Sequence, residues 1–269
     1  MNYKFAVFAY GDVGAATVRM FRDNINQLEF VLLDKENFWN KNHLIIEEAE
    51  KLNVKYCYYE NDDQLKKICQ GLDVVILAWW GKIIPKEVIS IPSNGIINLH
   101  TSYLPYGKGK HPHYWAITED TPYGVTIMKI DEGLDTGNII FQKQIKKTWE
   151  DTGKTLYFKG IKALCALLEE KKDDILNLNF KERSQEGIGS FHYGKEINDA
   201  SFIELSREYK AKDLLNIIRA RTFAPFPAAY FYYNNEKYEV RVQINKVTGK
   251  LENNINYDEI SMEGLKINE

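Results

Sequence analysis

Short apolar runs alternate with longer helical stretches near the start of the chain, and this alternation constrains the fold more than any other feature. The runs and the helical stretches between them fall near residues 5–10, 11–22, 30–33, 40–52, 54–58, 62–70 and 74–78. Strands that are separated by helices usually pair in parallel, and the helices cover both faces of the sheet. We therefore predict an α/β fold with a mostly parallel sheet over residues 1–180.

The first turn, Gly11-Asp12-Val13-Gly14, is typical of a Rossmann-like sheet. It has two glycines where a dinucleotide-binding fingerprint has three, and it lacks a clean acidic partner for a ribose, for which Asp34 is one candidate. A tight turn that packs a helix on a strand therefore explains these glycines better than dinucleotide binding does.

A second polar feature lies inside a buried strand. Residues 96–100 form an apolar run that is interrupted by Asn98 and His100. Side chains two positions apart on a strand point to the same face. An unpaired buried polar group costs about 1–3 kcal/mol, so these two side chains either bond to neighbours or line a site. The loop 101–115 that follows is rich in glycine, proline, lysine and aromatic residues, and loops after parallel strands often bind ligands.

A carboxylate follows the next strand. Residues 123–130 alternate as a strand does, and Asp135 comes after them between Gly133 and Gly137. Glycines on both sides predict a tight loop that holds the Asp135 carboxylate in place.

Four motifs in this order resemble the folate-dependent formyltransferases, and the substrate loop is closest to the nucleotide-sugar N-formyltransferases. The motifs are Trp80-Gly81-Lys82-Ile83-Ile84-Pro85, Asn98-Leu99-His100 with Leu104-Pro105, Gly124-Val125-Thr126-Ile127, and Gly133-Leu134-Asp135-Thr136-Gly137. The resemblance implies transfer of a formyl group from N10-formyltetrahydrofolate to an amine, without a metal. It also implies that Asn98, His100 and Asp135 are the catalytic residues.

The chemistry of these three residue types suits that reaction. An imidazole titrates near neutral pH, so His100 is the best general base. The Asn98 amide can donate to a developing oxyanion, and Asp135 can orient His100 or relay protons. The residues implied for the donor site are Trp80, Gly81, Lys82, Ile83, Ile84, Pro85, Asp131, Gly133 and Leu134. Those implied for the acceptor are Ser102, Tyr103, Tyr106, Lys108, Lys110 and Tyr114.

The acceptor is expected to be a UDP- or dTDP-linked deoxyamino sugar used for a surface glycan. Lys108 and Lys110 can meet a pyrophosphate, and the tyrosines can stack on a sugar or base; solvent exposure of the lysines is the alternative. Methionyl-tRNA formyltransferase is the alternative enzyme. Residues 196–269 hold ten Lys/Arg and twelve Asp/Glu, which is a poor surface for tRNA.

Composition sets further limits. The net charge of −3 gives no reason to expect nucleic acid as a partner. No apolar run approaches the length of a membrane span, and no signal peptide precedes the first strand, so we expect a cytoplasmic location with no membrane partner. The spacing of His100, His111 and His113 is wrong for common zinc sites.

Residues 181–269 are predicted to form a small β-rich C-terminal appendage. It has a helix near 212–221, an aromatic hairpin over 230–242 that could form a homodimer, and weak strands over 244–269. Two other classes of protein stay open. One is a catalytically silent regulator that binds folate or a nucleotide sugar, and the other is an NAD(P) oxidoreductase, for which Gly11 and Gly14 are the sole support.

Overall fold

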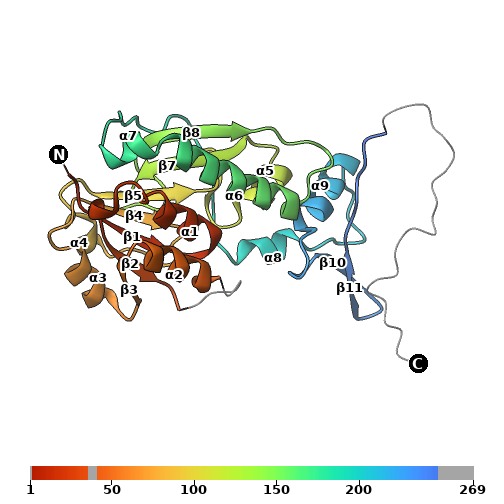
Figure 1. Cartoon of the computed structure of the whole chain (residues 1–269). Coiled ribbons are helices and arrows are strands. Elements are labelled where there is room, and N and C mark those ends of the chain that lie inside the picture. The colour runs from red at the N-terminus through yellow and green to blue at the C-terminus, as the bar shows by residue number, and fades with distance from the viewer. Residues whose placement is uncertain (1, 36–40, 248–269) are drawn as a thin grey trace, which may run out of the picture.

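The computed structural model describes residues 2–35 and 41–247, and these residues form a seven-stranded sheet with helices on both faces (Figure 1). The strands in spatial order are β3 (Lys55–Tyr58), β2 (Leu28–Leu33), β1 (Phe5–Ala9), β4 (Val74–Ala78), β5 (Ile96–His100), β7 (Tyr123–Lys129) and β8 (Ile139–Ile145). The first five pair in parallel, and β7 and β8 add antiparallel. This confirms the predicted α/β class with a mostly parallel sheet.

Alternate residues of β1 enter two separate cores. Val7 packs in a cluster with side chains of α1 (Gly11–Arg19), α2 (Asn42–Lys51) and α6 (Gly153–Glu170). Phe8 packs on the other face with side chains of α3 (Asp62–Cys69) and α4 (Lys86–Ile89). A strand that is covered on both faces is apolar throughout, which is why β1 and β4 read as unbroken apolar runs.

The two glycines of the first turn have a packing role. A Cβ on Gly14 would lie 3.0 Å from the Ala9 Cβ, and Gly11 has a φ of +58°. Glycine therefore lets α1 approach β1 closely, as the packing explanation predicts. Asp34, at the end of β2, is 3.3 Å from the Lys82 ammonium in an ion pair.

Several elements differ from the predicted ones. The first helix ends at Arg19 rather than near Arg22, and a helix, α5 (Pro112–Thr118), forms inside the predicted loop. Strand β8 was not predicted, because the polar residues after Phe141 hide its pattern. The charged run 171–174 begins a short helix, α7 (Lys172–Leu176), because Ile175 and Leu176 are buried behind it. The predicted irregular segment 173–202 also contains β9 (Phe191–His192) and α8 (Glu196–Ala200).

The C-terminal part has the predicted helix and hairpin, at one end of the molecule (Figure 1). They are α9 (Ala211–Arg221) and the antiparallel strands β10 (Ala229–Tyr233) and β11 (Glu236–Val240). The Arg219 guanidinium ties α9 to the loop before α6, since it donates to the carbonyl oxygens of Thr148 and Asp151 at 3.0 and 2.9 Å. Of the predicted tail strands, residues 244–247 are not in a strand and 248–269 lie outside the described residues.

Within the described ranges, no helix combines the length and the apolar character that crossing a bilayer requires.

A glycine on α6 accommodates a buried tyrosine. Tyr123 is 1% exposed, its hydroxyl has no hydrogen-bond partner among the described residues, and burial raises its pKa. A Cβ on Gly160 would lie 2.4 Å from this hydroxyl oxygen. The hydroxyl group therefore dictates glycine at this position of the helix.

Two substitutions test this contact by urea denaturation. Tyr123→Phe is expected to raise the free energy of unfolding by about 1 kcal/mol, because it removes an unpaired buried hydroxyl. Gly160→Ala is expected to lower it by about 1–3 kcal/mol through overpacking. In the Tyr123→Phe background the same alanine should cost less than about 1 kcal/mol. An equal cost in both backgrounds would contradict the contact.

Candidate active site

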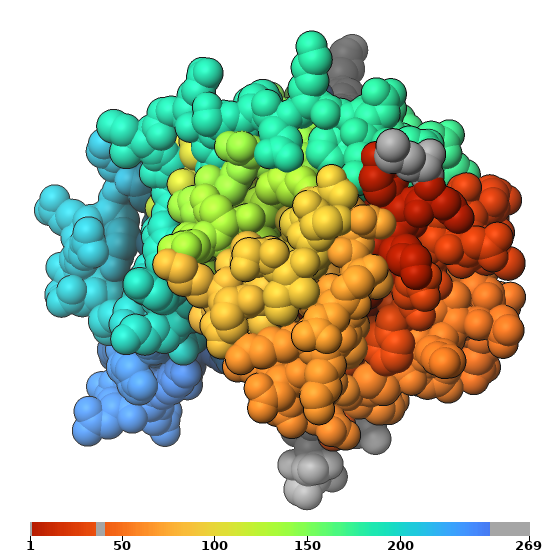
Figure 2. All heavy atoms as spheres, turned by 90° about the vertical axis from the view of Figure 1, so that its left-hand side faces the viewer, coloured from red at the N-terminus to blue at the C-terminus, as the bar shows by residue number. Residues whose placement is uncertain are grey.

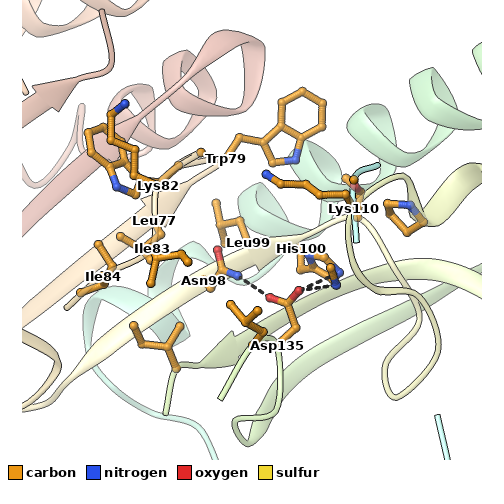
Figure 3. Close-up of a pocket in the computed structure, with 18 of the residues that line it drawn as sticks. Leu77, Trp79, Lys82, Ile83, Ile84, Asn98, Leu99, His100, Lys110 and Asp135 are labelled. Atoms are coloured by element: carbon orange, nitrogen blue, oxygen red, sulfur yellow. Dashed lines mark hydrogen bonds and ion pairs between the residues drawn. The ribbon is translucent and has the colours of Figure 1, made fainter. Parts of the chain in front are cut away.

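A cavity of about 1010 Å³ opens at the carboxyl ends of β4 and β5. Asn98 and His100 enter it from β5, and Asp135 enters it from the loop between β7 and β8 (Figure 3). Ligands of open α/β sheets bind at this edge. The structure therefore brings together the three predicted catalytic residues, which are 37 positions apart at most.

The Asp135 carboxylate is the centre of this group. Its Oδ1 is 3.4 Å from Asn98 Nδ2, and its Oδ2 is 3.7 Å from His100 Nε2. The backbone N–H of Gly109 donates to Oδ2 at 2.9 Å. Asp135 has a φ of +55°, a left-handed conformation that is uncommon for residues other than glycine. The side chains of His100 and Asp135 are 13% and 17% exposed, so they are shielded yet reachable from the cavity.

His100 is oriented by a backbone carbonyl. Its Nε2 lies 3.1 Å from the Gly107 carbonyl oxygen. A carbonyl only accepts, so this bond requires the proton on Nε2 and leaves the lone pair on Nδ1. The neutral ring held in this way can accept a proton from a substrate.

One wall of the cavity consists of the residues predicted for the donor. The cavity lining includes Trp80, Gly81, Lys82, Ile83, Ile84, Pro85, Asp131, Gly133 and Leu134. Figure 3 shows Ile83 and Ile84 on one side of Asn98, with Lys110 on the other. The Asp131 carboxylate accepts from the Gly133 N–H and the Thr136 hydroxyl, so it shapes the loop that carries Asp135.

Most of the residues predicted for the acceptor lie elsewhere. Lys110 lines the cavity, whereas Ser102, Tyr103, Tyr106, Lys108 and Tyr114 are not part of its lining. The structure places Tyr114 away from the cavity, because α5 turns its ring into the core, fully buried, and its hydroxyl donates to the Ala200 carbonyl at 2.7 Å. The Ser102 side chain is 1% exposed, and its role toward the acceptor stays a prediction.

Tyr103, Tyr106 and Lys108 also lie outside the cavity lining, and their role toward the acceptor stays a prediction. A Cβ on Gly124 would lie 2.9 Å from Tyr103 Cδ2, so this ring lies against β7. Tyr106 lies in the turn that follows Tyr103, and the Tyr106 N–H donates to the Tyr103 carbonyl at 3.1 Å. Lys108 belongs to the short strand β6 (Lys108–Gly109), which pairs in parallel with Phe191 and His192 of β9.

The second wall is aromatic and was not predicted. The cavity lining on this side includes Tyr10, Trp79, His111, Tyr157, Phe191, His192, Tyr193 and Phe226. Trp79 has a φ of +63°, and the sequence carries no signal for this unusual conformation at the end of β4. Aromatic rings with a few polar groups suit a sugar or a base.

Two histidines on this side are neutral near pH 7. Burial, with smaller contributions from Arg221 and Lys110, lowers the pKa of His111 to about 4. Burial, together with His111 and Arg221, lowers the pKa of His113 to about 3. The His113 ring packs against Tyr157 at 5.5 Å between ring centres.

These shifts predict a loss of stability in acid. The unfolded chain binds protons at a pKa near 6.5 and the folded chain near 3 or 4, so the free energy of unfolding falls as the pH falls below about 6.5. Between pH 7 and pH 5 we expect a loss of roughly 2 kcal/mol for each histidine. Urea denaturation at both pH values should show a smaller loss in His113→Gln and the full loss in the exposed control His43→Gln. Equal pH dependence in both variants would contradict the assignment.

In the described part of the chain, no group of three or more His, Cys, Asp or Glu side chains is arranged to hold a metal ion.

Comparison with known proteins places the chain in a family. Residues 41–168 match the Formyl transferase family, and residues 196–246 match the N-formyltransferase dimerization C-terminal domain. The formyltransferase PseJ from Anoxybacillus kamchatkensis is 31% identical over 64% of this chain and 88% of its own, with a TM-score of 0.53. The chain therefore belongs to the formyl transferase family.

Other relatives differ in how much of their length they share. Methionyl-tRNA formyltransferase from Thermodesulfovibrio yellowstonii is 34% identical over 182 residues, which are 66% of this chain and 58% of the relative. This chain thus spans a little over half the length of such curated relatives. A sugar N-formyltransferase from a Shewanella species has the same fold over 92% of this chain and 100% of its own, with a TM-score of 0.79 and 19% identity.

Proposed function

We propose that this protein transfers a formyl group from N10-formyltetrahydrofolate to the amino group of a UDP- or dTDP-linked deoxyamino sugar, for the synthesis of a surface glycan. The observation that carries the proposal is the Asn98–His100–Asp135 group between two unlike walls of one cavity. A volume of about 1010 Å³ lies at the upper end of the range for single-ligand pockets, which suits a reaction between two bound substrates.

The wall of the cavity that was predicted for the donor has groups that suit a folate. Leu77, Ile84 and Leu134 give an apolar surface, and the loop 81–85 brings backbone groups to it. A flat heterocycle with a polar edge needs this combination. PseJ is a relative in the same family whose structure holds a UDP-linked formamido sugar and tetrahydrofolate.

The three central residues would divide the chemistry of formyl transfer. The amine nitrogen forms a bond to the formyl carbon, the bond from that carbon to folate N10 breaks, and a proton passes from the amine to N10. Asn98 Nδ2 has two hydrogens; one faces Asp135 at 3.4 Å, and the other can donate to the formyl oxygen as it gains charge. His100 would take the amine proton, and Asp135 would stabilise the protonated ring.

The second candidate is methionyl-tRNA formyltransferase, which the curated relatives favour. The acidic balance of residues 196–269 and the fold shared with a sugar N-formyltransferase over 92% of this chain favour the sugar. Mass spectrometry of a panel of UDP- and dTDP-linked 3-amino and 4-amino deoxysugars, with Met-tRNA assayed in parallel, separates the two. Formylation of Met-tRNA alone would overturn the sugar as acceptor.

A homodimer is part of the proposal. The hairpin exposes Tyr232, Tyr233 and Tyr238, which are 54%, 60% and 40% exposed, and it falls within the match to the dimerization domain. Exposed aromatic groups of this kind favour association. A monomer in sedimentation at micromolar concentration would exclude the dimer.

A further inference from the structure

We propose that the connecting segment, residues 183–194, positions His100 and Asp135 for the reaction. This inference rests on the proposed function. The connecting segment lies between the two family matches, 41–168 and 196–246, so neither match covers it. In Figure 2 the blue-green residues of this part of the chain border the yellow-green residues near the Asp135 loop.

Gln185 holds the backbone on both sides of Asp135. Its Nε2 donates to the Asp135 carbonyl at 2.8 Å and to the Gly137 carbonyl at 2.9 Å. An amide nitrogen can donate two hydrogen bonds at once without a charge, so one side chain closes the loop. The loop itself is tight, because Asp135 has a φ of +55° and a Cβ on Gly137 would lie 2.1 Å from the Lys129 carbonyl oxygen.

Ser190 supports His100 indirectly, because Gly107 contacts both side chains. The Gly107 N–H donates to Ser190 Oγ at 3.0 Å, and the Gly107 carbonyl oxygen lies 3.1 Å from His100 Nε2. Gly107 has a φ of +68°, which glycine adopts without strain. Ser190 therefore fixes the carbonyl that sets the orientation of the His100 ring.

A two-residue strand pairing gives Asp135 a second support. The Lys108 N–H donates to the Ser190 carbonyl and the Lys110 N–H to the His192 carbonyl, both at 3.0 Å. These bonds align β6, whose Gly109 N–H donates to the Asp135 carboxylate at 2.9 Å. The Asp135 carboxylate is thus held by β6, and the Asp135 backbone is held by Gln185.

Both ends of the connecting segment are anchored. At one end Arg183 and Ile139 exchange two backbone hydrogen bonds of 2.8 and 2.9 Å. At the other end His192 stacks on Trp115, with ring centres 3.6 Å apart, and its two nitrogens lie 2.6 Å from Glu119 and 2.9 Å from Glu196.

The middle of the connecting segment has little part in the core. Residues 183, 184 and 186–188 are exposed, and Ile188 is 100% exposed. Loss of the Gln185 or Ser190 bonds should therefore change the site more than the stability of the fold.

Five variants test the proposal in the full chain. Gln185→Met keeps the length of the side chain without its donors, and Ser190→Ala removes the acceptor of Gly107. The exposed neighbours Glu186→Met and Ser184→Ala are the matched controls. We expect kcat for formyl transfer to fall at least about tenfold in the first two variants, because a small misplacement of reacting groups is costly. KM should stay within about twofold and the controls should match wild type; Ser190→Thr, which keeps the oxygen, should restore most of kcat.

A second readout does not need activity. Amide hydrogen exchange by NMR should become faster at Gly107 in Ser190→Ala and at Gly109 in Gln185→Met, and not in the controls. Unchanged exchange in both variants overturns the proposal, and so does wild-type kcat in an enzyme that transfers formyl groups. If wild type formylates no acceptor, the proposed function fails, and the exchange rates alone decide whether the connecting segment holds these backbone groups.

Discussion

Asn98→Ala is expected to lower kcat for formyl transfer by roughly 10²–10³-fold, the usual cost of removing one donor to a developing oxyanion. The Asn98 Nδ2 faces Asp135 at 3.4 Å, which leaves its second N–H available to a formyl oxygen bound in the cavity. The interaction strengthens in the transition state, and KM for the donor should therefore change much less than kcat.

Steady-state kinetics with a formylated acceptor as product measure this effect. Asn94→Ala is the matched control, because this exposed side chain bonds only to Ser93 among the contacts described for it. A kcat for Asn98→Ala within threefold of wild type would exclude Asn98 from the chemistry.

His100→Ala is expected to lower kcat by roughly 10²–10⁴-fold, the range for loss of a positioned general base. His100→Gln separates the two functions of this side chain. Its amide can still donate to the Gly107 carbonyl, which lies 3.1 Å from His100 Nε2 in the native protein, but it cannot take a proton. We expect both variants to be impaired alike.

The exposed His43 provides the control, and His43→Ala should keep wild-type kcat. Full activity of His100→Gln would mean that the ring acts only as a hydrogen-bond donor. The proton would then leave the amine by another route, and the role proposed for His100 would be wrong.

The sequence was sufficient to predict every strand of the large sheet except β8, and to single out Asn98, His100 and Asp135. Strands β1 and β4 are buried on both faces, so their apolar runs are easy to recognise. Asn98 and His100 stand out because polar residues two positions apart break such a run in β5, and the glycines around Asp135 indicate a tight loop.

The second, aromatic wall of the cavity could not be predicted in the same way. The aromatic pattern of loop 101–115 does not reveal that a helix starts at Pro112 and buries Tyr114. Gln185 and Ser190 contact residues 50 and 83 positions away, and no local pattern indicates such contacts. Positions of this kind depend on how distant segments meet after folding.

The most direct test of the account is transfer of an isotope-labelled formyl group from N10-formyltetrahydrofolate to UDP- and dTDP-linked amino sugars, followed by mass spectrometry. We predict that one acceptor gains one labelled formyl group in equal amount to the tetrahydrofolate released, and that Asn98→Ala and His100→Ala give almost none. The account would be contradicted if Met-tRNA gained the label and no sugar did. It would also be contradicted if the wild type and both variants labelled the sugar equally.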